Sequence, residues 1–200
     1  LSEYFEEISI AVRKIHREGN GQVFLLAHST GGLTAALYMN SGQEKHLITG
    51  LILNSPFLDF NLSKFQKSIS KPIARFMAAT SPYSKVNGTI PKAYGQSLHK
   101  FYEGEWDYKL KWKPLKGFPT YFAWINAVAL AQQKLKNSNI EVPVLVLHAS
   151  KSLKLSVFNA EASSSDLILD VDDIKRLGPS LGPKVMVQEI RNAVHDVFLS

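Results

Sequence analysis

The segment LLAHSTGG at residues 25–32 places a serine, Ser29, between an apolar run and a pair of glycines. The run QVFLLA is typical of a buried strand, and GGLTAALYM is typical of a helix packed closely on a sheet. A sharp turn from strand to helix exposes the serine hydroxyl, provided that the residues two before and two after it are small. These residues are Ala27 and Gly31. The segment therefore predicts Ser29 as a nucleophile, and the alternative is a serine that only caps the helix.

A serine nucleophile needs a base that takes up its proton. His195, in the segment AVHDVF, follows the last predicted strand and is the predicted general base. The other histidines lie on the first helix, beside the serine, before a strand, in the aromatic middle segment and at the end of a strand, and we expect none of them to be the base: His16, His28, His46, His99 and His148.

The acid that orients the base has competing candidates in the sequence. Asp166, in SSSDLILDVDDIKRL, lies between a predicted strand and the next helix, and it keeps the order Ser, Asp, His along the chain. Asp59 follows an earlier strand and is the alternative. Asp170, Asp172 and Asp173 are typical of residues that begin a helix. We favour Asp166.

The elements that must position these residues alternate along the chain. A helical pattern over 2–17 is followed by an apolar strand over 22–29 that we expect to be buried on both faces, a helix over 31–40 and a second strand over 46–56. The pattern resumes with a strand over 140–150, a helix over 171–182 and a strand over 184–190. This alternation predicts an α/β fold with a mostly parallel sheet.

The segment 57–139 interrupts this pattern with several prolines, short helical patterns and all three tryptophans of the chain. An aromatic, irregular insertion is typical of a cap over a binding site, and the alternative is that its rings only form a small core. We therefore expect a first core part at 1–56, a helical cap at 57–139 and a second core part at 140–200. Phe57, Trp106 and Trp124 are the expected substrate contacts.

The positive charge of the chain is concentrated in this middle segment. The formal net charge is +6, and residues 60–139 hold thirteen lysines and arginines against three acidic residues. A solvated lysine-rich surface is the simpler interpretation, and a surface that attracts anionic lipid head groups or acidic substrates is the alternative. We do not expect nucleic-acid binding, because arginine is scarce and no recognition module is visible.

The composition is that of a globular chain, with 45% hydrophobic and 20% charged residues. The absence of cysteine excludes disulfides, thiolate nucleophiles and thiolate-bound zinc. No apolar stretch is long enough to cross a bilayer, so we expect a soluble, cytoplasmic protein. The sequence does not predict the oligomeric state.

Five segments together resemble the α/β-hydrolase superfamily, and within it the serine aminopeptidase-type hydrolases that include monoacylglycerol lipases and lysophospholipases: LLAHSTGG, LILNSPF, VPVLVLHAS, DLILDVDDI and AVHDVFLS. The resemblance implies a mostly parallel sheet with an inserted cap, a triad of Ser29, Asp166 and His195, and no metal or organic cofactor. It also implies that the backbone N–H of Thr30 forms part of an oxyanion hole. In most relatives the acid follows its strand closely, whereas here residues 149–165 intervene, and an inserted loop is the simplest explanation.

The implied function is cleavage of carboxylic esters, acylglycerol or lysophospholipid-like, through an acyl-enzyme. The alternatives are an aminopeptidase that uses the same triad and a non-catalytic binding protein on a hydrolase fold. Relatives have further strands before the first helix, with a loop that gives the second oxyanion donor, and a helix after the histidine. The sequence is therefore expected to be truncated at both ends, nearly inactive in isolation and prone to associate through an exposed sheet edge.

Overall fold

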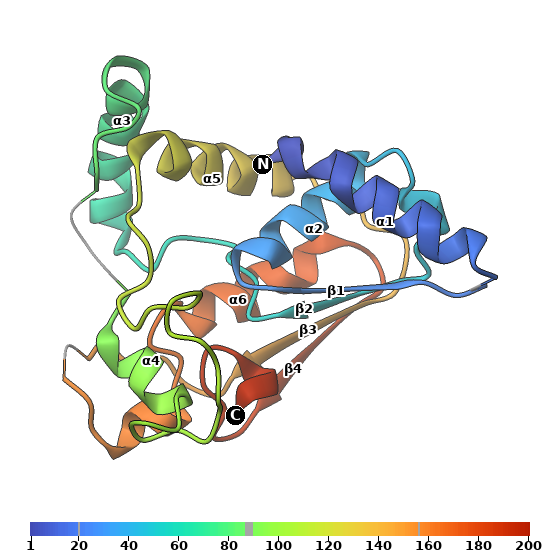
Figure 1. Ribbon diagram of the computed structural model, residues 1–200. Helices are drawn as coiled ribbons and strands as arrows, with labels where there is room; N and C mark the ends of the chain where they lie inside the picture. Colours follow the sequence, from blue (N-terminus) through green and yellow to red (C-terminus); the bar gives the residue numbers. More distant parts are fainter. Residues whose placement is uncertain (20, 87–89, 156) are drawn as a thin grey trace. The chain divides into compact units, whose positions relative to one another are not determined.

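The computed structural model describes residues 1–19, 21–86, 90–155 and 157–200. Their arrangement confirms the α/β class (Figure 1). The α-helices and strands follow one another in the order α1 (Phe5–Arg17), β1 (Phe24–His28), α2 (Thr30–Ser41), β2 (Gly50–Asn54), α3 (Lys64–Thr80), α4 (Lys92–Leu98), α5 (Phe122–Leu135), β3 (Val144–Ala149), α6 (Val171–Leu177) and β4 (Val185–Ile190). Short 3-10 helices lie at Ser2–Tyr4, Lys45–Leu47, Ala160–Ser164, Gly178–Leu181 and Val197–Leu199.

The four strands form one sheet in the order β1-β2-β3-β4. β1 pairs in parallel with β2, with Leu25 opposite Leu51, and β2 pairs in parallel with β3, with Leu53 opposite Val146. Parallel neighbours need a crossover, which α2 supplies between β1 and β2. Because the carboxyl ends of parallel strands share one edge of a sheet, the residue after β1, Ser29, lies at that edge.

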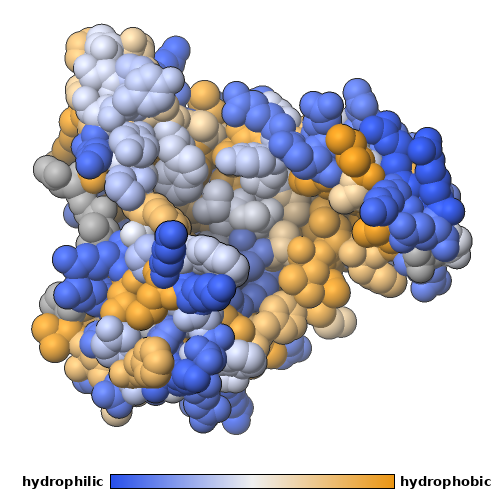
Figure 2. All heavy atoms as spheres, viewed as in Figure 1, coloured by the Kyte–Doolittle hydropathy of each residue, from blue (hydrophilic) through white to orange (hydrophobic). Residues whose placement is uncertain are grey.

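In the part of the chain that the structure describes, one face of the edge strand β1 is exposed, so the prediction that β1 is buried on both faces is wrong. Phe24 and Leu26 are 57% and 53% exposed, and Met186 on β4 is 64% exposed. Successive side chains of a strand point to opposite faces, and α2 packs on the face that carries Ala27. Figure 2 shows an apolar surface over the strands.

The chain divides into two compact units. The sheet unit comprises Leu1–Asp59, Leu130–His148 and Asp172–Glu189. Its core is made of side chains from the strands and from the helices that pack on them, among them Leu33 of α2 and Leu53 of β2, neither of which is exposed to solvent. This packing fixes the turn that follows β1.

The helical unit comprises Phe60–Ala129, Ala149–Val171 and Ile190–Ser200. It contains α3, α4 and the first turns of α5. The sequence predicts only short helices here, yet α3 is 17 residues long and continues through Pro72. A capping box starts this helix, because the Ser63 hydroxyl accepts a hydrogen bond from the Gln66 backbone N–H while the Gln66 side chain accepts one from the Ser63 N–H.

Candidate active site

Ser29 occupies a strained turn between β1 and α2. Its backbone has φ 52° and ψ −117°, a conformation that residues other than glycine rarely adopt. Three hydrogen bonds hold it there: the Ser29 N–H donates to the Asn54 carbonyl (3.0 Å), and the Ser29 carbonyl accepts from the N–H groups of Leu33 (3.2 Å) and Phe57 (3.0 Å). The Ser29 side chain makes no capping hydrogen bond to α2. Ser29 thus has the strained backbone that a sharp strand-to-helix turn requires, and its side chain does not cap α2.

The need for a small side chain is greatest one residue later than the sequence predicts. A Cβ on Gly31 would lie 4.0 Å from the Ala27 Cβ, which is an ordinary contact. A Cβ on Gly32 would lie 3.0 Å from the Cβ and 3.1 Å from the Cα of Pro56. The close approach of α2 to the loop after β2 therefore depends on Gly32.

Neighbours of Ser29 are held by the sheet and by α2. The ring of His28 donates from Nδ1 to the Asn54 carbonyl (3.1 Å). Thr30 is the first residue of α2, and the first N–H groups of a helix have no intrahelical acceptor. The backbone of Phe57 is held on both sides, because its N–H donates to Ser29 and its carbonyl accepts from Nε2 of Gln132 (3.1 Å).

Asp166 and His195 form a buried hydrogen-bonded pair in the helical unit. Nδ1 of His195 lies 2.8 Å from Oδ2 of Asp166, and their side chains are 3% and 0% exposed. The other carboxylate oxygen, Oδ1, accepts from the backbone N–H groups of Ile168 and Leu169, both at 2.8 Å. An ionised carboxylate can only accept hydrogen bonds, so Nδ1 of His195 must be the donor and carries the proton. In the neutral imidazole the other nitrogen, Nε2, is then the basic one.

The two ends of the loop inserted before the acid are bridged to each other. Ser152 and Asp166 form an isolated parallel bridge. In this bridge the Leu153 N–H donates to the Asp166 carbonyl and the Asp166 N–H donates to the Lys151 carbonyl, both at 2.9 Å. The chain therefore returns Asp166 to the residues that directly follow β3.

The other candidate acids have different partners. Asp59 lies 3.8 Å from the Arg176 guanidinium. Asp172 and Asp173 lie in the first turn of α6, where the sequence predicts helix-starting residues, and Asp173 also pairs with Arg176. The carboxylate that hydrogen-bonds Nδ1 of His195 is that of Asp166.

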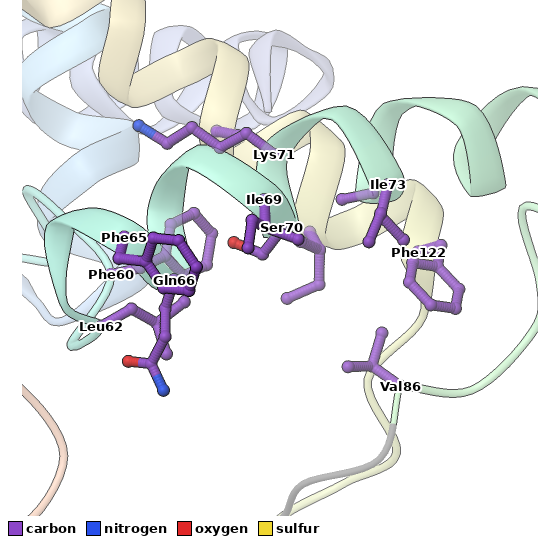
Figure 3. Close-up of a pocket in the computed structure, with 13 residues that line it drawn as sticks. Phe60, Leu62, Phe65, Gln66, Ile69, Ser70, Lys71, Ile73, Val86 and Phe122 are labelled. Atoms are coloured by element: carbon purple, nitrogen blue, oxygen red, sulfur yellow. The ribbon is translucent and has the colours of Figure 1, made fainter.

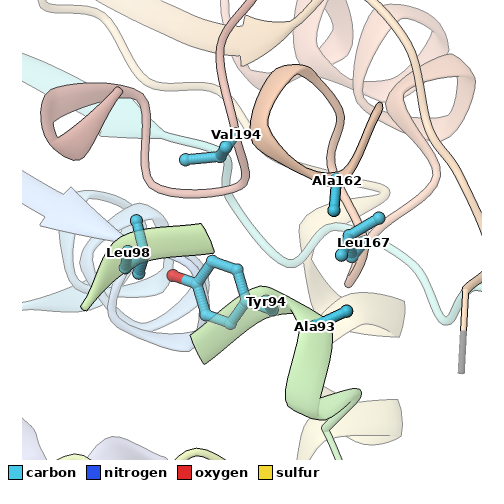
Figure 4. Packing of buried hydrophobic residues seen from close by; sticks show 6 residues of the cluster. All are labelled: Ala93, Tyr94, Leu98, Ala162, Leu167 and Val194. Carbon is cyan, nitrogen blue, oxygen red and sulfur yellow. The ribbon is translucent and has the colours of Figure 1, made fainter. Parts of the chain in front are cut away.

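The ring of Tyr94, which the sequence analysis did not single out, packs against His195. The two ring centroids are 5.6 Å apart and the planes meet at 74°, an edge-to-face contact. Burial raises the pKa of the Tyr94 phenol, with smaller contributions from the carboxylates of Asp196 and Asp166. Tyr94 belongs to a buried cluster that also contains Val194, next to His195 (Figure 4).

The two predicted tryptophan contacts lie outside the apolar pocket of the helical unit. Trp106 donates from Nε1 to the Leu199 carbonyl (2.7 Å), and Trp124 lies on α5. The pocket has a volume of about 450 Å³ and lies between α3 and α5 (Figure 3). It is lined mainly by apolar side chains: Phe60, Leu62, Phe65, Ile69, Ile73, Ala74, Val86, Phe122, Ile125 and Ala129, with Gln66, Ser70 and Lys71. The helical spacing of 62, 65, 69 and 73 is the signal that could have indicated it.

His99, a buried histidine of the same unit, has a structural role. Its Nδ1 accepts from the Phe101 N–H (3.1 Å), and its Nε2 therefore donates to the Tyr108 carbonyl (2.9 Å). Within the described residues, no group of three or more histidines and carboxylates could hold a metal ion.

Most of the chain matches a known protein family: residues 1–156 match the family model described as serine aminopeptidase, S33. A comparison with curated protein sequences found no significant match.

Two solved structures share the fold. A monoacylglycerol lipase from Paleococcus ferrophilus is 20% identical with a TM-score of 0.63, and the match covers 97% of this chain and 68% of that one. A soluble variant of monoglyceride lipase from Saccharomyces cerevisiae, in complex with a substrate analogue, is 18% identical with a TM-score of 0.64, and the match covers 98% and 61%. The chain thus spans about two thirds of the length of these proteins.

Proposed function

Since the chain belongs to the serine aminopeptidase S33 family, we propose that it carries the catalytic residues of a carboxylic-ester hydrolase, with Ser29 as nucleophile, His195 as general base and Asp166 as orienting acid. The observation that carries the proposal is the buried hydrogen bond between Asp166 and His195, which leaves Nε2 of His195 as the basic nitrogen. The strained turn at Ser29 supports the assignment of the nucleophile.

The proposed reaction proceeds in two halves. Oγ of Ser29 bonds to the ester carbonyl carbon while its proton passes to Nε2 of His195, and the backbone N–H of Thr30 donates to the resulting oxyanion. The bond to the alcohol oxygen then breaks, and the alcohol leaves with the proton from Nε2. A water molecule, deprotonated by the same nitrogen, releases the acid from the acyl-enzyme and restores Ser29.

The proposed substrates are esters with a medium or long acyl chain, of the acylglycerol or lysophospholipid kind. The support is the apolar pocket between α3 and α5, which offers about 450 Å³ lined mostly by aliphatic and aromatic side chains. Such a pocket suits a hydrocarbon chain, because burial of each CH₂ group contributes about 0.8 kcal/mol. Phe57, Trp106 and Trp124 stay predicted as additional substrate contacts.

A surface of anionic lipid is the proposed source of these substrates. On α3, Phe65 and Phe76 are 73% and 66% exposed, and the same helix carries three lysines and one arginine but no acidic residue. An exposed apolar stripe beside basic side chains is typical of a helix that lies at a lipid surface. None of the helices in the described part of the chain has the length and apolar character to span a bilayer. Sedimentation with vesicles of phosphatidylserine, but not with vesicles of phosphatidylcholine alone, is the expected result.

An aminopeptidase on the same triad is the second candidate, because the family description names that activity. An aminopeptidase needs carboxylates that bind the ammonium group of its substrate. In the middle segment, Asp107 already pairs with Lys100 at 2.6 Å, and Glu103 and Glu105 lie among many lysines. The ester hydrolase is therefore the preferred function.

The experiment is a series of nitrophenyl esters of increasing chain length, given to the whole protein that carries this chain, with aminoacyl naphthylamides in parallel. We expect hydrolysis of the esters, a preference for the longer chains and no turnover by the Ser29→Ala variant. Faster hydrolysis of the naphthylamides would reverse the order of the two candidates. An inert wild-type protein would favour a binding role instead.

A further inference from the structure

The phenol hydroxyl of Tyr94 is buried, and the described residues around it give it no hydrogen bond. The residue is 5% exposed, and in the part of the chain that the structure describes its hydroxyl has no hydrogen-bond partner. A buried hydroxyl without a partner is costly, and phenylalanine would fill the same space without that cost. The hydroxyl therefore makes no hydrogen bond that would hold the side chain in its position. The contacts of Tyr94 are made by its aromatic ring.

The ring of Tyr94 supplies a constraint that Asp166 cannot supply alone. The hydrogen bond from Nδ1 of His195 to Asp166 holds one nitrogen of the ring at 2.8 Å from the carboxylate. The edge-to-face contact with Tyr94, with centroids 5.6 Å apart, acts on the ring as a whole and limits the tilt of its plane. The two contacts together define the direction in which Nε2 points.

The position of the Tyr94 ring is itself held by its surroundings. The Lys113 ammonium lies over the ring at 5.4 Å from its centroid and also over the ring of Tyr108 at 5.6 Å. On the same short helix, Leu98 packs in the buried cluster that contains Tyr94 and Val194 (Figure 4). The backbone of α4, the Lys113 ammonium and the buried cluster together hold the Tyr94 ring in one position next to His195.

We propose that Tyr94 is a positioning residue for His195, whose aromatic ring fixes the plane of the imidazole beside Asp166. This inference rests on the proposed function, because positioning matters for catalysis only if His195 is the general base. The side chain acts through His195, and the ring rather than the hydroxyl performs the role. Tyr94→Phe therefore keeps the role, and Tyr94→Leu, which removes the ring, loses it.

The test combines kinetics with a spectroscopic measurement that does not depend on turnover. In the whole protein, NMR follows the imidazole C2–H and the Nδ1–H of His195 in the wild type and in both variants. Hydrolysis of a nitrophenyl ester gives kcat and KM. We expect Tyr94→Phe to match the wild type. In Tyr94→Leu we expect a shifted C2–H signal, a broadened Nδ1–H signal and a kcat about 10- to 100-fold lower at unchanged KM, because a misdirected base slows only the chemical step.

Val128→Ala is the control, because it truncates a fully buried side chain of the helical unit outside the cluster that holds Tyr94. If it lowers kcat as much as Tyr94→Leu at temperatures where both are folded, the effect is general loosening and the inference fails. It also fails if Tyr94→Leu keeps the wild-type signals and kcat, or if Tyr94→Phe loses as much as Tyr94→Leu. An inert wild type with the expected NMR changes would overturn the proposed function but leave the positioning contact established.

Discussion

Nδ1 of His195 donates a hydrogen bond over 2.8 Å to Oδ2 of Asp166, although the two residues are separated by a loop, a helix and a strand in the sequence. The pair is closed to solvent, and the second carboxylate oxygen is occupied by two backbone N–H groups. Asp166 therefore has one remaining task, which is to hold the tautomer of His195 that leaves Nε2 basic.

The first prediction concerns this tautomer. Asp166→Asn replaces an acceptor by an amide that can present a donor to Nδ1, which would move the imidazole proton to Nε2 and remove the base. We expect kcat/KM for a nitrophenyl ester to fall by about 10⁴-fold. Asp59→Asn is the matched control, because Asp59 lies beside Arg176, and we expect less than about a threefold change. The reverse order of the two losses would make Asp59 the triad acid.

The second prediction concerns the two glycines of the turn. Gly32→Ala brings a methyl group within 3.0 Å of Pro56, so α2 or the loop after β2 must shift. We expect the free energy of unfolding to fall by roughly 1–3 kcal/mol. Gly31→Ala adds the same atom where there is room, and helix propensity favours alanine there, so stability should be unchanged or increased by up to about 1 kcal/mol. Urea unfolding of both variants measures these changes. An equal loss in the free energy of unfolding for Gly32→Ala and Gly31→Ala would contradict the account.

The third prediction concerns the apolar pocket. Ala129→Phe fills part of the space between α3 and α5, where Ala129 lines the wall. We expect kcat/KM for long-chain esters to fall at least about tenfold, because several CH₂ groups lose their burial, while short-chain esters are hydrolysed as before. Ala79→Phe, on α3 outside the pocket, is the control for an added ring. An equal loss for all chain lengths would place the acyl chain elsewhere.

The fourth prediction concerns alkaline pH. Burial raises the pKa of the Tyr94 phenol above its ordinary value of 10.0. Below about pH 10 both the folded and the unfolded states hold the proton, whereas above it only the unfolded state loses it. The folded state then binds more protons, so stability falls with rising pH by at most about 1.4 kcal/mol per pH unit from this group. Tyr94→Phe should therefore gain stability over the wild type as the pH rises above about 10.

Urea unfolding at several pH values checks this prediction. Tyr83→Phe is the control, since it removes a phenol hydroxyl from an exposed side chain. Below about pH 10, Tyr94→Phe should already be more stable than the wild type by about 1–3 kcal/mol, because it removes a buried hydroxyl that has no partner among the described residues. A destabilised Tyr94→Phe would mean that the hydroxyl has a partner in solution.

The parts of the molecule that follow from local patterns were predictable. β1, β2 and β3 lie in apolar runs, and the turn at Ser29 lies where the first of these runs meets the helical pattern that begins at the glycine pair. The extent of α3 was not predictable, because a proline inside a helical pattern normally ends or kinks the helix, whereas α3 continues through Pro72. The exposed face of β1 was also missed, because an apolar run does not tell which of its faces a helix covers.

In the candidate site, too, residues marked by a local sequence pattern were predictable, whereas contacts between distant segments were not. Chain order favours Asp166 over Asp59, but the backbone bonds between Asp166 and the residues after β3, and its contact with His195, are tertiary features that chain order does not contain. Tyr94 has no local signal at all, because it meets His195 through the packing of α4 in a cluster assembled from distant segments. The predicted contacts were two tryptophans, whereas the pocket is lined by aliphatic side chains and phenylalanines.

The central claim is that Ser29 is a nucleophile activated by His195. Its most direct test is the rate at which a fluorophosphonate modifies the whole protein, with the modified residue identified by peptide mass spectrometry. We predict modification of Ser29 in the wild type, at a rate that falls at least about 10³-fold in the His195→Gln variant. Modification of a different residue, or of Ser29 at the same rate in both proteins, would contradict the account.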